Sequence, residues 1–375
     1  MPSRARLLTY LLAALALAIA LTPAFVCAVR LTSDADDDRP VPPPPPLPPP
    51  PPDEGPQALV RYIDRLEVEG PYSDRGLSVF TLMTGTPESG SDDLTLDEGI
   101  AEGDLVIEEK PGGVVPTLTI RNLSDRVAFL MAGEIVSGGK QNRTLSSDGF
   151  FPPGGPFDLP VFCVEQHRWA AEGKFDSAKA AAPPAMRAGI AQGHDQGAVW
   201  RDAERAQAEA GVKSDTGDVT VIYRDAKTAR AVDEAAARIL DQMPRPRRRY
   251  VGLVIARGDQ IVSADIFENY MIYAKLHRKV IRSHVVESLG KRYAGVPTTT
   301  AVRAFLARVR GAAQNLRPAP GGRAQLVRVS GHGLGGEWLL HNGQCIHAAL
   351  FPQIVRPIPV PMREDRPTEQ EGRQP

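Results

Sequence analysis

Acidic, basic and amide side chains gather in one stretch of the sequence, residues 133–169. Glutamates are common general acids and bases, and arginines bind carboxylates and phosphates through paired hydrogen bonds. Side-chain amides can bind the edge of a sugar or a base, and an indole offers a face for stacking. The combination indicates a site for an anionic ligand. The candidate catalytic residues are Glu134 and Glu165, and the candidate ligand-binding residues are Lys140, Gln141, Asn142, Arg143, Arg168 and Trp169.

Each of these residues also has an ordinary structural explanation. A glutamate paired with Lys140, Arg143 or Arg168 would stabilise a loop without taking part in chemistry. Cys163 lies between two apolar residues, which is more typical of a buried thiol than of a nucleophile. The concentration of polar groups in one stretch favours a functional site over a set of unrelated structural contacts.

Glycines and flanking strands should position this stretch. The pair Gly138-Gly139 allows the backbone to turn through positive φ. Residues 121–131 and 160–164 have the composition of strands, so we expect the polar residues on a loop held by a sheet, where binding sites are usually built.

Nucleotide and metal motifs are not supported. Gly331, Gly333 and Gly336 match the spacing of a dinucleotide-binding loop, but the residues that follow have the pattern of a strand instead of a helix. Residues 133–140 resemble a P-loop, but Gln141 stands where a magnesium-binding Ser or Thr is needed. Neither CxxC nor HExxH occurs. The sequence therefore predicts no cofactor and no metal site.

The N-terminus has the features of an export signal. Arg4 and Arg6 precede an apolar run over residues 7–21, which predicts a signal peptide at 1–28. An uncleaved membrane anchor over residues 7–29 remains the alternative. Both place the body outside the cytoplasm, as a periplasmic, secreted or membrane-anchored protein, with membrane contact only through this segment.

The rest of the chain divides by composition into three further parts. Residues 29–56 are acidic and then almost pure proline, which predicts a disordered stalk. Residues 57–362 are long enough for a single domain with its own core, and residues 363–375 form a charged tail. A net charge of -1 argues against a nucleic-acid surface. The sequence leaves open whether Cys163 and Cys345 form a disulfide.

Periodicity in the body predicts an α+β fold with an antiparallel, β-rich core and a group of helices in the second half. The β-rich part covers 57–169, the helix-rich part 170–313, and a C-terminal hairpin 324–351. The predicted strands include 59–69, 77–84, 105–108, 116–122, 249–256 and 260–267. The predicted helices are 200–210, 225–243 with Asp225 as N-cap, 272–289, and a third long one capped by Thr299 or Thr300.

An ordered set of short segments points to a family. The segments are 94–98, 122–125, 133–134, 139–143, 163–165, 168–169, 196–197 with Trp200, 258–259, Val262 and 265–267. Together they resemble the domain named for its association with ADP-ribosylglycohydrolases and with rhodanese/phosphatase-superfamily proteins. The resemblance extends from about residue 57 to residue 351 and implies one family domain.

The resemblance implies a substrate that carries ADP-ribose or another phosphorylated nucleotide. One hypothesis is therefore a hydrolase or transferase in which Glu134 or Glu165 is the general base and the neighbouring cations hold the anion. The other hypothesis is a non-catalytic module of the cell envelope that binds a ligand or a partner through the same residues.

Overall fold

The computed structural model describes residues 55–85, 90–110, 115–168, 173–245 and 249–354. The predicted signal, the predicted tail and all but the last two residues of the predicted stalk lie outside these ranges. In the described part of the chain, no helix combines the length and the apolar composition needed to cross a membrane.

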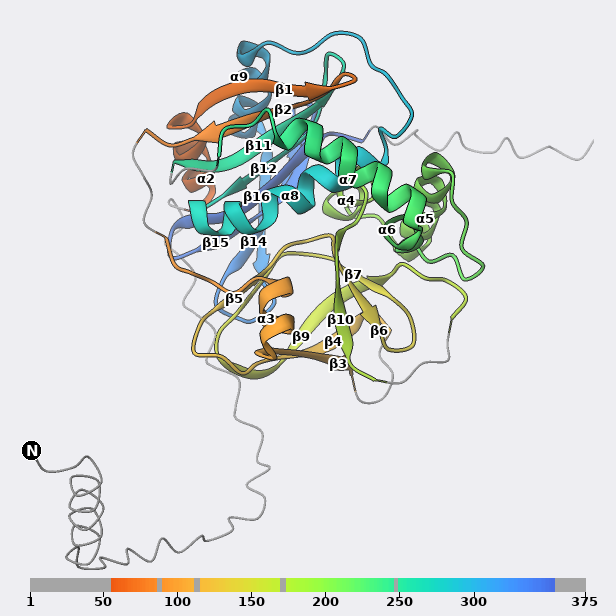
Figure 1. The fold of residues 1–375 in the computed structure, drawn as a ribbon. Helices are drawn as coiled ribbons and strands as arrows, with labels where there is room; N and C mark the ends of the chain where they lie inside the picture. Colours follow the sequence, from red (N-terminus) through yellow and green to blue (C-terminus); the bar gives the residue numbers. More distant parts are fainter. Residues whose placement is uncertain (1–54, 86–89, 111–114, 169–172, 246–248, 355–375) are drawn as a thin grey trace, which may run out of the picture. The chain divides into compact units, whose positions relative to one another are not determined.

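The larger sheet has eight antiparallel strands (Figure 1). Its central pair joins strands from distant parts of the chain, because Ala264 pairs with Leu350. The strands, in spatial order, are β1 (Glu67–Asp74), β2 (Leu77–Met83), β11 (Tyr250–Arg257), β12 (Gln260–Phe267), β16 (Gln344–Pro352), β15 (Leu334–His341), β14 (Gln325–Gly331) and β13 (Ala313–Pro318).

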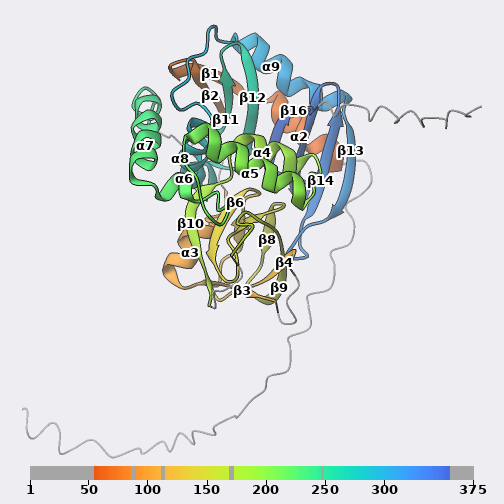
Figure 2. The ribbon, with the colours of Figure 1, turned by 90° about the vertical axis from the view of Figure 1, so that its right-hand side faces the viewer.

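Both faces of this sheet are covered, so its central strands are apolar on both sides. Neighbouring residues of β2 show this, since Val79 and Phe80 are both fully buried but belong to different core clusters. Helices α2 (Gly55–Asp64) and α9 (Thr299–Ala307) pack on the face that Phe80 occupies. The other face packs against helices that Figures 1 and 2 show across the middle of the molecule.

The smaller sheets are built from the middle of the sequence. Leu118 and Ile120 of β4 point into a core shared with α3 (Leu96–Glu102) and with the two-stranded sheet. The six strands, in spatial order, are β10 (Phe175–Ala181), β6 (Glu134–Gly138), β7 (Arg143–Leu145), β9 (Gly154–Cys163), β4 (Thr117–Asn122) and β3 (Leu105–Glu109). The two-stranded sheet is β5 (Ala128–Leu130) with β8 (Gly149–Phe151).

Most helices lie in the second half of the chain, so the structure confirms the predicted α+β class with an antiparallel, β-rich core. Asp225 caps α7 by accepting a hydrogen bond from the Thr228 amide, as predicted. The remaining helices are α4 (Pro184–Ala191), α5 (Gln196–Ala210), α6 (Val221–Arg224), α7 (Ala226–Leu240), α8 (Tyr270–Val286) and the short 3-10 turn η1 (Arg308–Gly311).

The predicted strand at 59–69 is wrong over most of its length, because residues 55–64 form helix α2 and strand β1 begins only at Glu67. Leu59, Tyr62, Ile63 and Leu66 are buried at steps of one, three and four residues. That spacing covers one face of a helix, whereas a strand would bury every second residue.

Other boundaries also differ from the prediction. Helix α8 ends at Val286, ahead of the predicted 289, and the chain then turns toward Gly290 with φ +70. The cap of α9 is Thr298, one residue before the predicted position. The predicted strands at 249–256 and 260–267 form a hairpin, and the predicted C-terminal hairpin is also present. Asn342 and Gly343 have φ values of 48 and 75 between β15 and β16, as a tight hairpin requires.

Candidate functional site

Glu134 begins strand β6 and its side chain is fully buried. One carboxylate oxygen accepts a hydrogen bond from the Met131 amide at 2.8 Å, and the other lies 2.5 Å from the ammonium of Lys279 in α8. Lys279 also lies 2.8 Å from Asp97 in α3. Burial raises the pKa of Glu134, while Lys279 opposes this rise. Three elements are therefore joined by one buried ammonium shared between two carboxylates.

Glu165 follows strand β9 and is held by a different set of donors. Its oxygens accept hydrogen bonds from the Asn142 amide at 3.1 Å, from Arg168 Nε at 2.8 Å and from the Thr216 hydroxyl at 2.8 Å. Burial alone would raise the pKa of Glu165, but these donors outweigh it and hold that pKa below its usual value. The carboxylate is therefore firmly ionised.

The guanidinium of Arg168 donates all of its hydrogen bonds in the described structure to other groups of the protein. Nε binds Glu165, Nη1 donates to the Gly139 carbonyl at 2.8 Å, and Nη2 donates to the Asn142 side-chain oxygen at 3.2 Å. These bonds satisfy the carbonyls of a turn in which Gly138 and Gly139 both have positive φ. Arg168 thus ties the glycine turn to the segment after β9.

Arg143 and Gln141 form a second buried pair beside this turn. Arg143 is 1% exposed, and its Nη1 donates to the Gln141 side-chain oxygen at 3.0 Å. The Gln141 amide donates in turn to the Gln166 carbonyl at 3.1 Å. Arg143 pairs in register with Cys163 on β9, and burial raises the pKa of that thiol. A thiol with a raised pKa is a weak nucleophile at neutral pH.

The structure thus brings together most, but not all, of the candidate residues. Asn142, Arg143 and Gln141 lie with Glu165 and Arg168 around one turn, and Lys140 extends from it into solvent. Glu134 shares no bonding partner with Glu165 in the part of the chain described. Trp169 lies outside the described residues.

A second charged cluster joins the large sheet to the segments beside it. Arg187 in α4 lies 2.5 Å from Asp265 in β12, and His347 in β16 lies 2.7 Å from Asp148 and 3.4 Å from Asp265. All four side chains are buried. Burial alone would lower the pKa of His347, but the two carboxylates outweigh it and raise that pKa to about 9.

This second cluster was not predicted from the sequence. Its four members are far apart in the chain: the register of β12 against β16 brings Asp265 near His347, and tertiary packing adds Arg187 from α4 and Asp148 from the segment before β8. One signal was available: Asp265 and His347 are ionisable residues within otherwise apolar strands, and a buried charge in such a place requires a partner.

The space beside this cluster is very small. A cavity of about 10 Å³ is bounded by Asp148, Arg187 and Glu337 together with mostly apolar residues that include Ile190 and Phe351. It has room for about one water molecule. The Arg187 Nε lies there without a hydrogen-bond partner among the described residues. A substrate larger than water does not fit against these charges in this conformation.

Neither cluster has the donor set of a metal centre. Across the described ranges, no three side chains of His, Cys, Asp or Glu are grouped so that they could hold a metal ion. Cys163 and Cys345 are both free and buried, so the disulfide that the sequence left open is not formed.

One family model matches the region that contains both clusters, the six-stranded sheet and nearly all of the eight-stranded sheet. The model of the ARG and Rhodanese-Phosphatase-superfamily-associated Protein domain matches residues 65–351. No curated protein and no solved structure matches the chain. Since the matched region is most of the sequence and contains every candidate site residue, the chain belongs to the ARG and Rhodanese-Phosphatase-superfamily-associated Protein domain family.

Proposed function

We propose that this chain is a non-catalytic module of the cell envelope that binds a ligand or a partner protein without converting it. The observation that carries this proposal is the state of the two candidate acid–base carboxylates. Glu134 and Glu165 are both buried, and each is held by hydrogen-bond donors of the protein itself.

A general acid or base must come within hydrogen-bond distance of the group that it protonates or deprotonates. Glu134 is enclosed by the sheet and by α8, and its partner is Lys279. Glu165 has a lowered pKa, which makes it a weak base. Its neighbours Arg143 and Arg168 already donate to protein oxygens, so they are poor anchors for a substrate anion.

What the network does support is a rigid turn. Its shape is fixed by hydrogen bonds: the Asn142 side-chain oxygen accepts from the Gly138 amide, and the Arg168 guanidinium donates to the carbonyls of Gly138 and Gly139. The exposed Lys140 projects from this turn. A fixed loop with one outward cation is suited to binding an anion with little loss of conformational entropy. The association of this family with ADP-ribosylglycohydrolases supports ADP-ribose or a similar phosphate-bearing compound as the ligand.

The experiment combines binding and turnover in one sample. Purified protein is mixed with ADP-ribose, the melting temperature is recorded, and the compound is then analysed by mass spectrometry. We expect a rise in melting temperature, since a ligand of the native state stabilises it, with the compound recovered intact. Lys140→Ala should weaken the rise, whereas Lys213→Ala, an exposed lysine on another segment, should not.

Consumption of ADP-ribose would overturn the proposal, provided that the activity belongs to this chain. Glu165→Gln decides that point, because it removes the charge of the candidate base and retains its size. If the native chain turns the compound over and Glu165→Gln still binds it without turnover, the chain is an enzyme and Glu165 is its base.

A further inference from the structure

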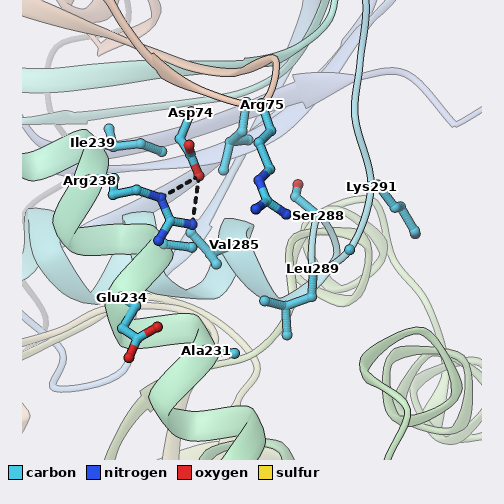
Figure 3. Close-up of a pocket in the computed structure, with 13 residues that line it drawn as sticks. Asp74, Arg75, Ala231, Glu234, Arg238, Ile239, Val285, Ser288, Leu289 and Lys291 are labelled. Atoms are coloured by element: carbon cyan, nitrogen blue, oxygen red, sulfur yellow. Dashed lines mark hydrogen bonds and ion pairs between the residues drawn. The ribbon is translucent and has the colours of Figure 1, made fainter.

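A separate groove lies beside helix α7. It is formed by the β1–β2 turn, one face of α7 and the C-terminal end of α8, and it has a volume of about 240 Å³ (Figure 3). None of the residues of the two charged clusters described above lines it. The kind of ligand that the groove can bind therefore depends on its own side chains.

The floor of the groove is apolar. Leu77 from β2, Ala235 and Ile239 from α7, and Val285 from α8 are all buried, and Leu289 extends the same surface. A ligand that covers this floor removes apolar surface from water, which favours binding in proportion to the area covered.

The rim carries three cations and two anions, and most of them are already paired. Arg238 binds Asp74 through Nε at 3.1 Å and Nη2 at 2.9 Å. Lys291 binds Glu209 at 3.0 Å, outside the groove, and Glu234 binds an arginine on its own helix. Among the residues that the structure describes, these pairs leave one cation of the rim without a partner.

That cation is Arg75, which is exposed and extends from the β1–β2 turn toward the end of α8 (Figure 3). Its guanidinium has no hydrogen bond or ion pair with the other residues that line the groove. Arginine donors in this state are available to a carboxylate, which they bind through two parallel hydrogen bonds.

The backbone of Arg75 adopts a left-handed conformation that is energetically unfavourable for arginine. Arg75 and Gly76 have φ values of 50 and 84, which is the geometry of a two-residue turn that favours Asn, Asp or Gly at the first position. The Tyr293 amide donates to the Arg75 carbonyl at 3.0 Å, so the turn is fixed from outside. An arginine in an unfavourable backbone conformation beside a groove points to a role for its side chain.

We propose that this groove binds a small amphipathic monoanion, with its carboxylate on Arg75 and its apolar body on the floor beside Leu289 and Ile239. A single free cation matches a single negative charge. Glu234 on the same rim disfavours a more highly charged ligand, because like charges repel across so short a groove. This inference does not depend on the function proposed above.

Octanoate is a suitable probe, and octanol is its uncharged counterpart. In calorimetric titrations of the purified full chain, we expect octanoate to bind more tightly than octanol, and the difference to shrink at high salt. Arg75→Asn should weaken octanoate binding about tenfold and leave octanol unchanged, since an ion pair with hydrogen bonds is lost. Asn suits the turn, so this variant keeps the hairpin.

Two further variants locate the site. Ala231→Trp fills the groove from an exposed position on α7 and should abolish binding of both compounds. Lys227→Ala, on the same helix but outside the groove, should bind like the native chain. The proposal is wrong if octanoate does not bind, if it binds Arg75→Asn as tightly as the native chain, or if Ala231→Trp retains binding. Failure here leaves the non-catalytic assignment untouched, because that assignment is tested by the recovery of ADP-ribose.

Discussion

Replacing His347 with glutamine should change how the stability of this protein depends on pH. His347 is fully buried between Asp148 and Asp265, and Arg187 balances the second carboxylate. No other ionisable side chain of the described residues forms a bond to this imidazole. Its protonation is therefore governed by these neighbours.

The sign and size of the effect follow from the raised pKa. His347 has a pKa of about 9 in the folded chain, against an ordinary value of 6.5. The difference corresponds to about 3 kcal/mol of stabilisation. Because the folded pKa is the higher one, the full contribution is present below pH 6.5 and is lost as the pH rises through about 9.

Urea denaturation at pH 6 and at pH 10 measures this contribution. At pH 6, we expect His347→Gln to be less stable than the native chain by about 3–5 kcal/mol, because two buried carboxylates lose their shared cation. At pH 10 the gap should be about 3 kcal/mol smaller, because the native imidazole is then neutral as well. His167→Gln replaces an exposed histidine and serves as the matched control.

The reasoning is refuted if the gap between the native chain and His347→Gln is the same at both pH values. That result would mean that His347 does not lose a proton between pH 6 and pH 10, contrary to a folded pKa of about 9. A gap that widens with pH would be equally incompatible with a raised pKa.

Three further expectations concern stability and reactivity. Lys279→Met should cost about 3–5 kcal/mol in urea denaturation, because Glu134 is left buried without its cation; a loss below about 1 kcal/mol contradicts the pairing. Gly336→Ala should cost about 1–3 kcal/mol, because its Cβ would lie 2.3 Å from the Ala349 carbonyl oxygen. Gly85→Ala, whose added Cβ would meet no atom of the described residues within 4 Å, should be neutral, and equal losses would refute the steric argument. Both described cysteines should resist a thiol reagent until urea unfolds the chain, as peptide mapping can show.

The fold class was predictable because several elements carry their signals locally. The cap at Asp225, the Asn-Gly turn at 342–343 and the alternation over residues 117–122 act over a few residues and need no distant partner. Helix α2 was mistaken for a strand because its aromatic and β-branched residues have strand propensity. Packing against the large sheet decided otherwise, since Leu59 and Tyr62 both face that sheet.

The candidate site was predictable only as a neighbourhood. Proximity in sequence placed Asn142, Glu165 and Arg168 around one turn. It could not show that their charges cancel one another, because that depends on side-chain directions at the ends of two strands. Proximity in sequence also could not predict that Asp265 lies near His347, because this depends on the register of β12 against β16.

The position of the six-stranded sheet within the chain has a consequence for the order of folding. Its strands all lie between Leu105 and Ala181, in the interval that separates β2 from its partner β11. A ribosome therefore releases β2 long before β11 exists, and one edge of that apolar strand waits unpaired while the intervening sheet forms. Unpaired strand edges make a partly synthesised chain prone to misassembly. Slow translation of residues 84–249 should therefore make this chain depend more strongly on a chaperone that binds unfolded segments.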